Sequence, residues 1–322
     1  MKRLFHRIKA LGAAMLLGAG MLGMLGGCGS TADNGNMKIV TTVFATYDLA
    51  KQLTERAGIS CEVKLLLTPG GESHAYEPTP SDVSAVQSCD LFVYIGGTSE
   101  KWAEKLIGSS RKDKRNLRLF DTVELLSEET VEGMEEEHEH EHEHEDEETD
   151  EHIWTAPLNA DAMLNAISGE LKQMQPDHAD ACDRAFREIH TELLELDAQA
   201  REIRETSPKD TLIFADRFPF RYLTHAYGWK YYAAFPGCSS DTDASAATLA
   251  FLIQKVKDEQ IQTVFYLENS QRKIADAVCK ATGANAVMLQ SCNNVSKEDM
   301  NAGRHYQEIM SENLNAIREA LK

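Results

Sequence analysis

Residues 177–205 read DHADACDRAFREIHTELLELDAQAREIRE, and this stretch decides how the rest of the chain is organised. Its apolar side chains recur every three or four positions, which is typical of the buried face of an amphipathic helix. The positions with this spacing are Ala185, Phe186, Ile189, Leu193, Leu196, Ala200 and Ile203. At about 1.5 Å per residue, such a helix would extend roughly 40 Å, the width of a domain. The sequence therefore predicts one long helix, ending before Ser207-Pro208, that joins two separate parts.

Both flanking parts alternate strands with helices. Before the long helix, strands are expected at residues 38–44, 61–67 and 91–95, and the last is almost entirely apolar. An unbroken apolar run is typical of a parallel strand covered on both faces. After the long helix, strands are expected at residues 211–215, 230–235, 261–267 and 286–289. We therefore expect an α/β fold of two Rossmann-like lobes, residues 37–175 and 207–322, joined by a linking helix at residues 176–206.

The first 27 residues are typical of a secretory leader. Four basic residues precede an apolar stretch, 11–25, that is short and glycine-rich for a spanning helix. The stretch ends in Leu25-Gly26-Gly27-Cys28, which resembles a bacterial lipobox. We expect a lipoprotein signal peptide over residues 1–27, a lipid on Cys28, and a flexible tether over residues 28–36. This predicts an extracytoplasmic protein anchored to the bacterial membrane; the alternative is an ordinary secretory signal with a chance cysteine.

One acidic segment accounts for most of the net charge of −19. Fifteen Asp and Glu residues and no Lys or Arg lie in residues 128–151, so the fold lacks the basic excess that nucleic-acid binding requires. Four histidines alternate with glutamates there: His138, His140, His142 and His144. Such a pattern cannot form a core, and a disordered loop is expected. We interpret it as an auxiliary, weak metal collector, because imidazoles bind zinc and carboxylates concentrate cations. The alternative is a charged spacer.

Six further cysteines lie outside the leader, and an even number permits disulfides outside the cytosol. They are Cys61, Cys89, Cys182, Cys238, Cys279 and Cys292. No CxxC pattern is present. Cys238 and Cys292 each follow an expected strand, so a disulfide between them is the favoured pairing. Buried free thiols are the alternative.

The segment GESHAYEPTP, residues 71–80, follows the carboxyl end of an expected strand, which is where open α/β sheets bind ligands. Thr79, Pro80 and Asp82 predict a capped helix start that would fix this loop. His74 is therefore a candidate metal ligand, although a lone loop histidine is more often a solvated surface residue.

A second segment, EHIWTAP, spans residues 151–157. His152 directly follows the acidic run and precedes a Trp-x-x-Pro turn. Taken alone, it would be an ordinary loop histidine.

Together these segments resemble the zinc and manganese solute-binding proteins of ABC transporters. That family has a Gly-x-x-x-His-x-Tyr/Phe-Glu-Pro-Thr/Ser-Pro motif and a later His-x-Trp-x-x-Pro motif, which here flank the acidic loop in the family's order. The C-terminal stretch with Tyr306, Met310, Asn313 and Leu314 is also similar. The resemblance implies two α/β lobes with a metal between them, and His74 and His152 as the ligands from the N-terminal lobe.

The C-terminal lobe departs from this family pattern. The resemblance places a His or Glu ligand five residues before Tyr222, where this chain has Arg217, which cannot bind a cation. Asp216 is the expected substitute, with pairing to a neighbouring arginine as the alternative. The family's fourth ligand maps near His305, with a surface helix start as the alternative reading. Glu268 also ends a strand, but capping of the next helix explains it equally well.

We therefore expect a monomeric metal-binding component for high-affinity zinc uptake that delivers the ion to a membrane permease. Zinc suits a site of imidazoles and one carboxylate, whereas more oxygen ligands would favour manganese. The alternatives are a manganese-specific homologue and a surface metal buffer or adhesin without transport. We do not expect an enzyme, because outside the alternating His/Glu run of residues 138–144 the sequence has no HExxH motif and no carboxylate in a fixed helical relation to a histidine.

Overall fold

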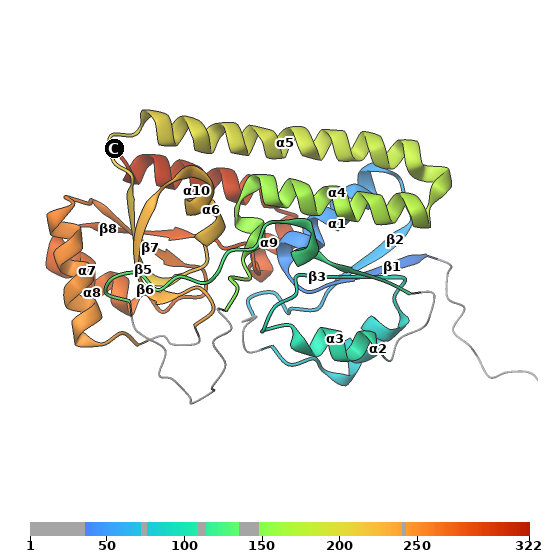
Figure 1. Ribbon diagram of the computed structural model, residues 1–322, viewed down its shortest axis with the longest axis horizontal. Helices are drawn as coiled ribbons and strands as arrows, with labels where there is room; N and C mark the ends of the chain where they lie inside the picture. Colours follow the sequence, from blue (N-terminus) through green and yellow to red (C-terminus); the bar gives the residue numbers. More distant parts are fainter. Residues whose placement is uncertain (1–35, 72–75, 109–113, 135–147, 240–242) are drawn as a thin grey trace, which may run out of the picture. The chain divides into compact units, whose positions relative to one another are not determined.

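Two parallel β-sheets lie on the same side of a long helix that runs across both of them (Figure 1). The computed structural model describes residues 36–71, 76–108, 114–134, 148–239 and 243–322. This confirms the predicted fold class of two α/β lobes and a joining helix.

The N-terminal sheet has the strand order β2-β1-β3-β4, with every neighbouring pair parallel. Its strands are β1 (Met37–Thr41), β2 (Cys61–Leu65), β3 (Leu91–Tyr94) and β4 (Arg115–Arg118). Its helices are α1 (Phe44–Arg56), α2 (Pro80–Ser88) and α3 (Lys101–Ile107). The predicted capping box of α2 is confirmed, because the Thr79 and Asp82 side chains each accept the other's backbone N–H. It anchors the chain directly after the segment that contains His74.

The C-terminal sheet has the order β6-β5-β7-β8 and is also parallel throughout. Its strands are β5 (Thr211–Phe218), β6 (Lys230–Pro236), β7 (Thr263–Leu267) and β8 (Asn285–Leu289). The accompanying helices are α6 (Arg221–Tyr227), α7 (Ala246–Asp258), α8 (Lys273–Thr282), α9 (Lys297–Ala302) and α10 (Tyr306–Ala320). The register of β5 against β6 shifts between Phe214 and Arg217, so β5 is irregular near its carboxyl end.

The long joining helix is α5 (Ala179–Thr206). Its predicted apolar face is confirmed, with Phe186 only partly buried and the other six positions buried. Figure 1 shows α5 running alongside α4 (Pro157–Met174) and α10, and α5 also packs on α1. One hydrophobic cluster contains buried residues from both lobes, so the lobes share a core. Over the described ranges, the structure contains no helix long and apolar enough to cross a membrane.

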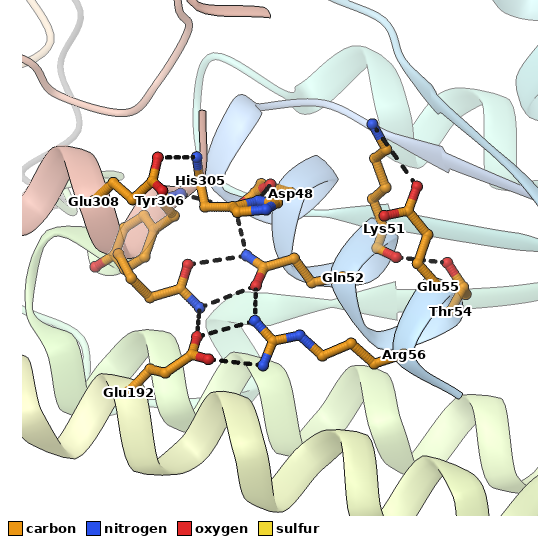
Figure 2. A network of polar contacts seen from close by, with 11 residues as sticks. Asp48, Lys51, Gln52, Thr54, Glu55, Arg56, Glu192, His305, Tyr306 and Glu308 are labelled. Atoms are coloured by element: carbon orange, nitrogen blue, oxygen red, sulfur yellow. Dashed lines mark hydrogen bonds and ion pairs between the residues drawn. The ribbon is translucent and has the colours of Figure 1, made fainter. Parts of the chain in front are cut away.

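The N-terminus of α10 is capped by a side chain from the other lobe (Figure 2). The buried Asp48 carboxylate, on α1, accepts hydrogen bonds from Tyr306 N at 2.8 Å, His305 Nδ1 at 2.9 Å and Gln52 Nε2 at 2.6 Å. Negative charge is stabilising at a helix N-terminus, where backbone N–H groups have no partner within the helix. Asp48 therefore holds the lobes together where α1 meets α10.

This contact makes stability depend on pH. The hydrogen bond to Asp48, reinforced by its charge and that of Glu308, raises the pKa of His305 despite partial burial and the nearby Arg56. Because the folded-state pKa is the higher one, the contribution is complete below the unfolded value of about 6.5 and is lost as pH rises through the folded value. We expect the difference in unfolding free energy between the parent and His305→Asn, from urea titrations at pH 5.5–8.5, to shrink with rising pH. It should stay below about 1 kcal/mol because His305 is partly exposed; a constant difference would contradict this role.

Candidate metal centre

His152 lies in a small polar cavity between the two lobes. The cavity measures about 30 Å³. It is lined by Gly71, His152, Arg217, Pro219, Gly237, Leu267, Glu268, Asn269, Ser291, Asn293 and Asn294. The C-terminal-lobe lining lies at or just beyond the carboxyl ends of β5, β6, β7 and β8, where parallel sheets bind ligands. A space of this volume fits a single ion or water rather than an organic metabolite.

The His152 imidazole is buried, with 1% of the residue exposed, and is surrounded by carboxylates. Asp150 Oδ1 accepts a hydrogen bond from His152 N at 2.8 Å and lies 3.2 Å from His152 Nδ1. Burial disfavours the imidazolium, but Asp150, Glu151 and Glu128 outweigh it and raise the pKa of His152. The same negative surroundings favour a bound cation.

A second cavity of about 30 Å³ shares His152 and Asn293 with the first. It lies on the side of the N-terminal lobe and contains two buried carboxylates, Glu100 and Glu151. Gly96 N donates to Glu100 at 2.9 Å, and Ser99 N donates to Glu151 at 2.8 Å. Burial raises the pKa of Glu100 to about 7 and also raises that of Glu151. Backbone N–H groups therefore hold both carboxylates in the cavity that His152 also lines.

Glu268 is the carboxylate that the C-terminal lobe brings to the polar cavity. It accepts hydrogen bonds from Ser291 N, at 2.8 Å, and from the Ser291 hydroxyl. Burial raises its pKa, although the Arg217 guanidinium acts in the opposite sense. Its position immediately after β7 is the only sequence signal that marks Glu268 as a candidate ligand. The same position is equally typical of a residue that caps the next helix.

The structure places Asp216 differently from our expectation. Its Oδ1 accepts from the adjacent Arg217 N at 2.9 Å within β5, and its Oδ2 accepts from Leu267 N at 3.2 Å, which ties β5 to the end of β7. Asp216 lines neither of the cavities that contain His152, whereas Arg217 lines the polar one. Asp216 therefore fixes the backbone around the site, and the arginine faces the cavity.

His305 and His152 are not brought into one cavity either. His305 lines a separate space of about 430 Å³ beside α5, together with Arg56, Glu192 and Gln307. The cause is the contact in Figure 2, because capping by Asp48 turns the start of α10 toward α1. His305 is the N-cap residue of α10, which agrees with the alternative interpretation of this histidine as part of a helix start.

Several sequence candidates lie outside the described residues: Cys28, His74, His138, His140, His142 and His144. The described residues on either side of the His74 segment do reach the site, because Gly71 lines the polar cavity and Tyr76 lines the second one. Within the described ranges, no three His, Cys, Asp or Glu side chains are grouped to hold a metal ion.

The expected disulfide between Cys238 and Cys292 is wrong. All six cysteines of the described chain are free. Cys292 is fully buried in the shared core, whereas Cys238 follows β6 and its backbone N–H donates to Glu128. The alternative reading of free thiols holds for these residues.

The chain is similar to known proteins over most of its length. Residues 39–320 match the model of the family described as ZnuA, zinc-uptake complex component A, periplasmic. The chain is 31% identical over 311 residues to the high-affinity zinc uptake system protein ZnuA of Bacillus subtilis (strain 168), and this match covers 92% of the chain and 94% of that protein. It is also 31% identical over 288 residues to the zinc-binding lipoprotein AdcA of Streptococcus pneumoniae (strain ATCC BAA-255 / R6), covering 89% of the chain but only 56% of AdcA.

A solved structure is similar as well. The crystal structure of the Zn(II)-bound ZnuA-like domain of Streptococcus pneumoniae AdcA is 27% identical, with a TM-score of 0.73. The similarity covers 89% of this chain and 99% of that domain. The likeness therefore includes both lobes and the joining helix.

Proposed function

The chain belongs to the ZnuA family of periplasmic zinc-uptake components, and we propose that it is the solute-binding component of an ABC transporter for high-affinity zinc uptake. In this role it captures the ion outside the cytoplasm and delivers it to the membrane permease. Family membership over residues 39–320 supports the transport role, and the B. subtilis relative is named as a zinc uptake protein. The single structural observation behind the proposal is the buried His152 in an ion-sized cavity that residues of both lobes line.

The ligand set that we propose is His152 and His74 from the N-terminal lobe and Glu268 from the C-terminal lobe. Zinc in proteins takes imidazole and carboxylate ligands, usually in a four-coordinate arrangement that a water can complete. Gly71 and Tyr76 line the two cavities around His152, which supports the assignment of the intervening His74. Glu268 replaces Asp216 and His305 in this proposal because it lines the polar cavity. Two imidazoles and one carboxylate favour zinc over manganese.

The remaining sequence features suit capture at a membrane surface. We propose that residues 1–27 are a signal peptide, that Cys28 carries a lipid, and that the mature protein works as a monomer. The AdcA relative is named as a lipoprotein, which supports the anchor. Mass spectrometry of the membrane fraction tests it, since a lipid on Cys28 adds a defined mass to the N-terminal peptide.

The His/Glu-rich loop is proposed to collect zinc weakly. Flexible imidazoles and carboxylates are not preorganised, so each site should exchange zinc quickly. Deleting residues 135–148 should remove several weak sites and leave one tight site per chain in a calorimetric zinc titration. Loss of the tight site in a protein with an unchanged circular dichroism spectrum would contradict this division of roles. A loop of equal length with Ser in place of His138, His140, His142 and His144 is the matched control.

Growth under zinc limitation tests the transport role. We expect deletion of the gene to slow growth in a zinc chelator, and expression of the parent protein or added zinc to restore it. Unchanged zinc accumulation in the deletion strain, measured in cells in which no second zinc importer is expressed, would favour a surface buffer instead.

A further inference from the structure

We propose that Asp150 is a positioning residue for zinc capture, whose carboxylate holds His152 by Nδ1 so that Nε2 is presented to the cavity. This inference rests on the proposed function, because it assigns a task to a residue beside the proposed zinc ligand. Asp150 was not among the candidates from sequence, although it lies only two positions before His152.

The contact between the two side chains defines the tautomer. An ionised carboxylate only accepts hydrogen bonds, so the imidazole nitrogen beside it must bear the proton. Asp150 Oδ1 lies 3.2 Å from His152 Nδ1 and also accepts from His152 N at 2.8 Å. The proton then resides on Nδ1, and Nε2 is the nitrogen of the neutral imidazole that bears the lone pair. Carboxylates that orient metal-binding histidines in this way also raise the basicity of the ligand.

Asp150 is itself held firmly in place. Only 1% of the residue is exposed. Its N–H donates to Leu126 O at 2.9 Å, and its carbonyl accepts from the Tyr222 hydroxyl, on α6, at 3.0 Å. That hydroxyl accepts from Leu126 N at 3.1 Å, so a C-terminal-lobe side chain joins Leu126 and Asp150. The carboxylate therefore has a fixed backbone from which to orient the imidazole.

The C-terminal lobe also limits movement of the pair. A Cβ atom added at Gly237 would meet Phe218 O at 2.8 Å, His152 Cε1 at 3.2 Å and Asp150 Oδ2 at 3.3 Å. The backbone after β6 thus packs directly on both side chains, and only glycine fits there. The two nearby carboxylates have other partners, because Glu151 accepts from Ser99 N and Glu128 accepts from Cys238 N.

Zinc affinity of Asp150 variants tests the inference. In the full mature chain, competition with a chelator strong enough to strip the loop isolates the tight site. We expect Asp150→Ala to weaken zinc binding by about 10–100-fold, the usual effect of removing the partner of a metal-binding histidine. Asp150→Asn should weaken it less, because its amide oxygen can still accept from Nδ1. The matched control is Asp161→Ala, since Asp161 Oδ1 lies 2.7 Å from Nδ1 of His190 outside the site; its zinc affinity should equal that of the parent.

A spectroscopic readout separates positioning from general destabilisation. Nitrogen NMR of the zinc-free parent should show His152, identified by the signals missing in His152→Ala, protonated on Nδ1. Asp150→Asn should keep this tautomer, whereas Asp150→Ala should populate both. Parental zinc affinity in folded Asp150→Ala, or a proton on Nε2 in the parent, would overturn the inference. If Asp150→Ala does not fold, parental affinity in folded Asp150→Leu, which has a side chain of similar size and no acceptor for Nδ1, would overturn it. Tight zinc binding that survives in the His152→Ala variant would instead refute the proposed function.

Discussion

Replacing His152 with alanine is expected to weaken tight zinc binding by about several hundredfold. A structural zinc site with four ligands has an apparent binding free energy of about 10–16 kcal/mol, so one ligand accounts for about 3–4 kcal/mol. The loss should reach this range because the imidazole is buried and held by Asp150. Chelator competition on the full mature chain measures the effect.

The control for this prediction is His190→Ala. Like His152, His190 has an aspartate beside its Nδ1, but it lies on α5 and lines neither cavity around His152. Its replacement should leave zinc affinity unchanged. A dissociation constant within about threefold of the parental value in His152→Ala would exclude His152 as a principal ligand.

Asp48→Ala is expected to lower the free energy of unfolding by about 3–5 kcal/mol. The carboxylate is buried and accepts three hydrogen bonds, from Gln52 on α1 and from His305 and Tyr306 in the other lobe. Removing it leaves a buried backbone N–H and two side chains without their acceptor, which is the costly way to break a buried charged network. Urea unfolding followed by circular dichroism measures the loss, and the core shared by both lobes favours a single transition.

The matched control is Asp276→Ala, because Asp276 pairs with Arg272 on an exposed face of α8. Such a surface pair contributes little, so its removal should change the unfolding midpoint only slightly. If Asp48→Ala lowered the free energy of unfolding no more than this control does, the claim that Asp48 holds α10 on the N-terminal lobe would be contradicted.

The architecture could be predicted from sequence because its signals are local. The three-and-four spacing of α5, the apolar run of β3 and the capping box at Thr79 each depend on neighbours within one element. His152 could likewise be singled out from a short motif. These features need no knowledge of what packs against them.

The candidate metal ligands of the C-terminal lobe could not be predicted in the same way. Successive side chains of a strand point to opposite faces, so whether residue 216 or 217 faces the cavity depends on the register of β5. That register shifts between Phe214 and Arg217, and no local sequence pattern predicts the shift. His305 is turned away by Asp48, a residue 257 positions earlier in the chain. The disulfide between Cys238 and Cys292 was predicted wrongly for a similar reason, because the positions of two cysteines in the sequence do not give the distance between them in the fold.

Zinc-edge anomalous diffraction from crystals of the zinc-loaded protein tests the central claim most directly. We predict one strong anomalous peak between the lobes, about 2.0–2.1 Å from His152 Nε2, with His74 and Glu268 as further ligands. Zinc bound elsewhere, with no peak in contact with His152, would contradict it.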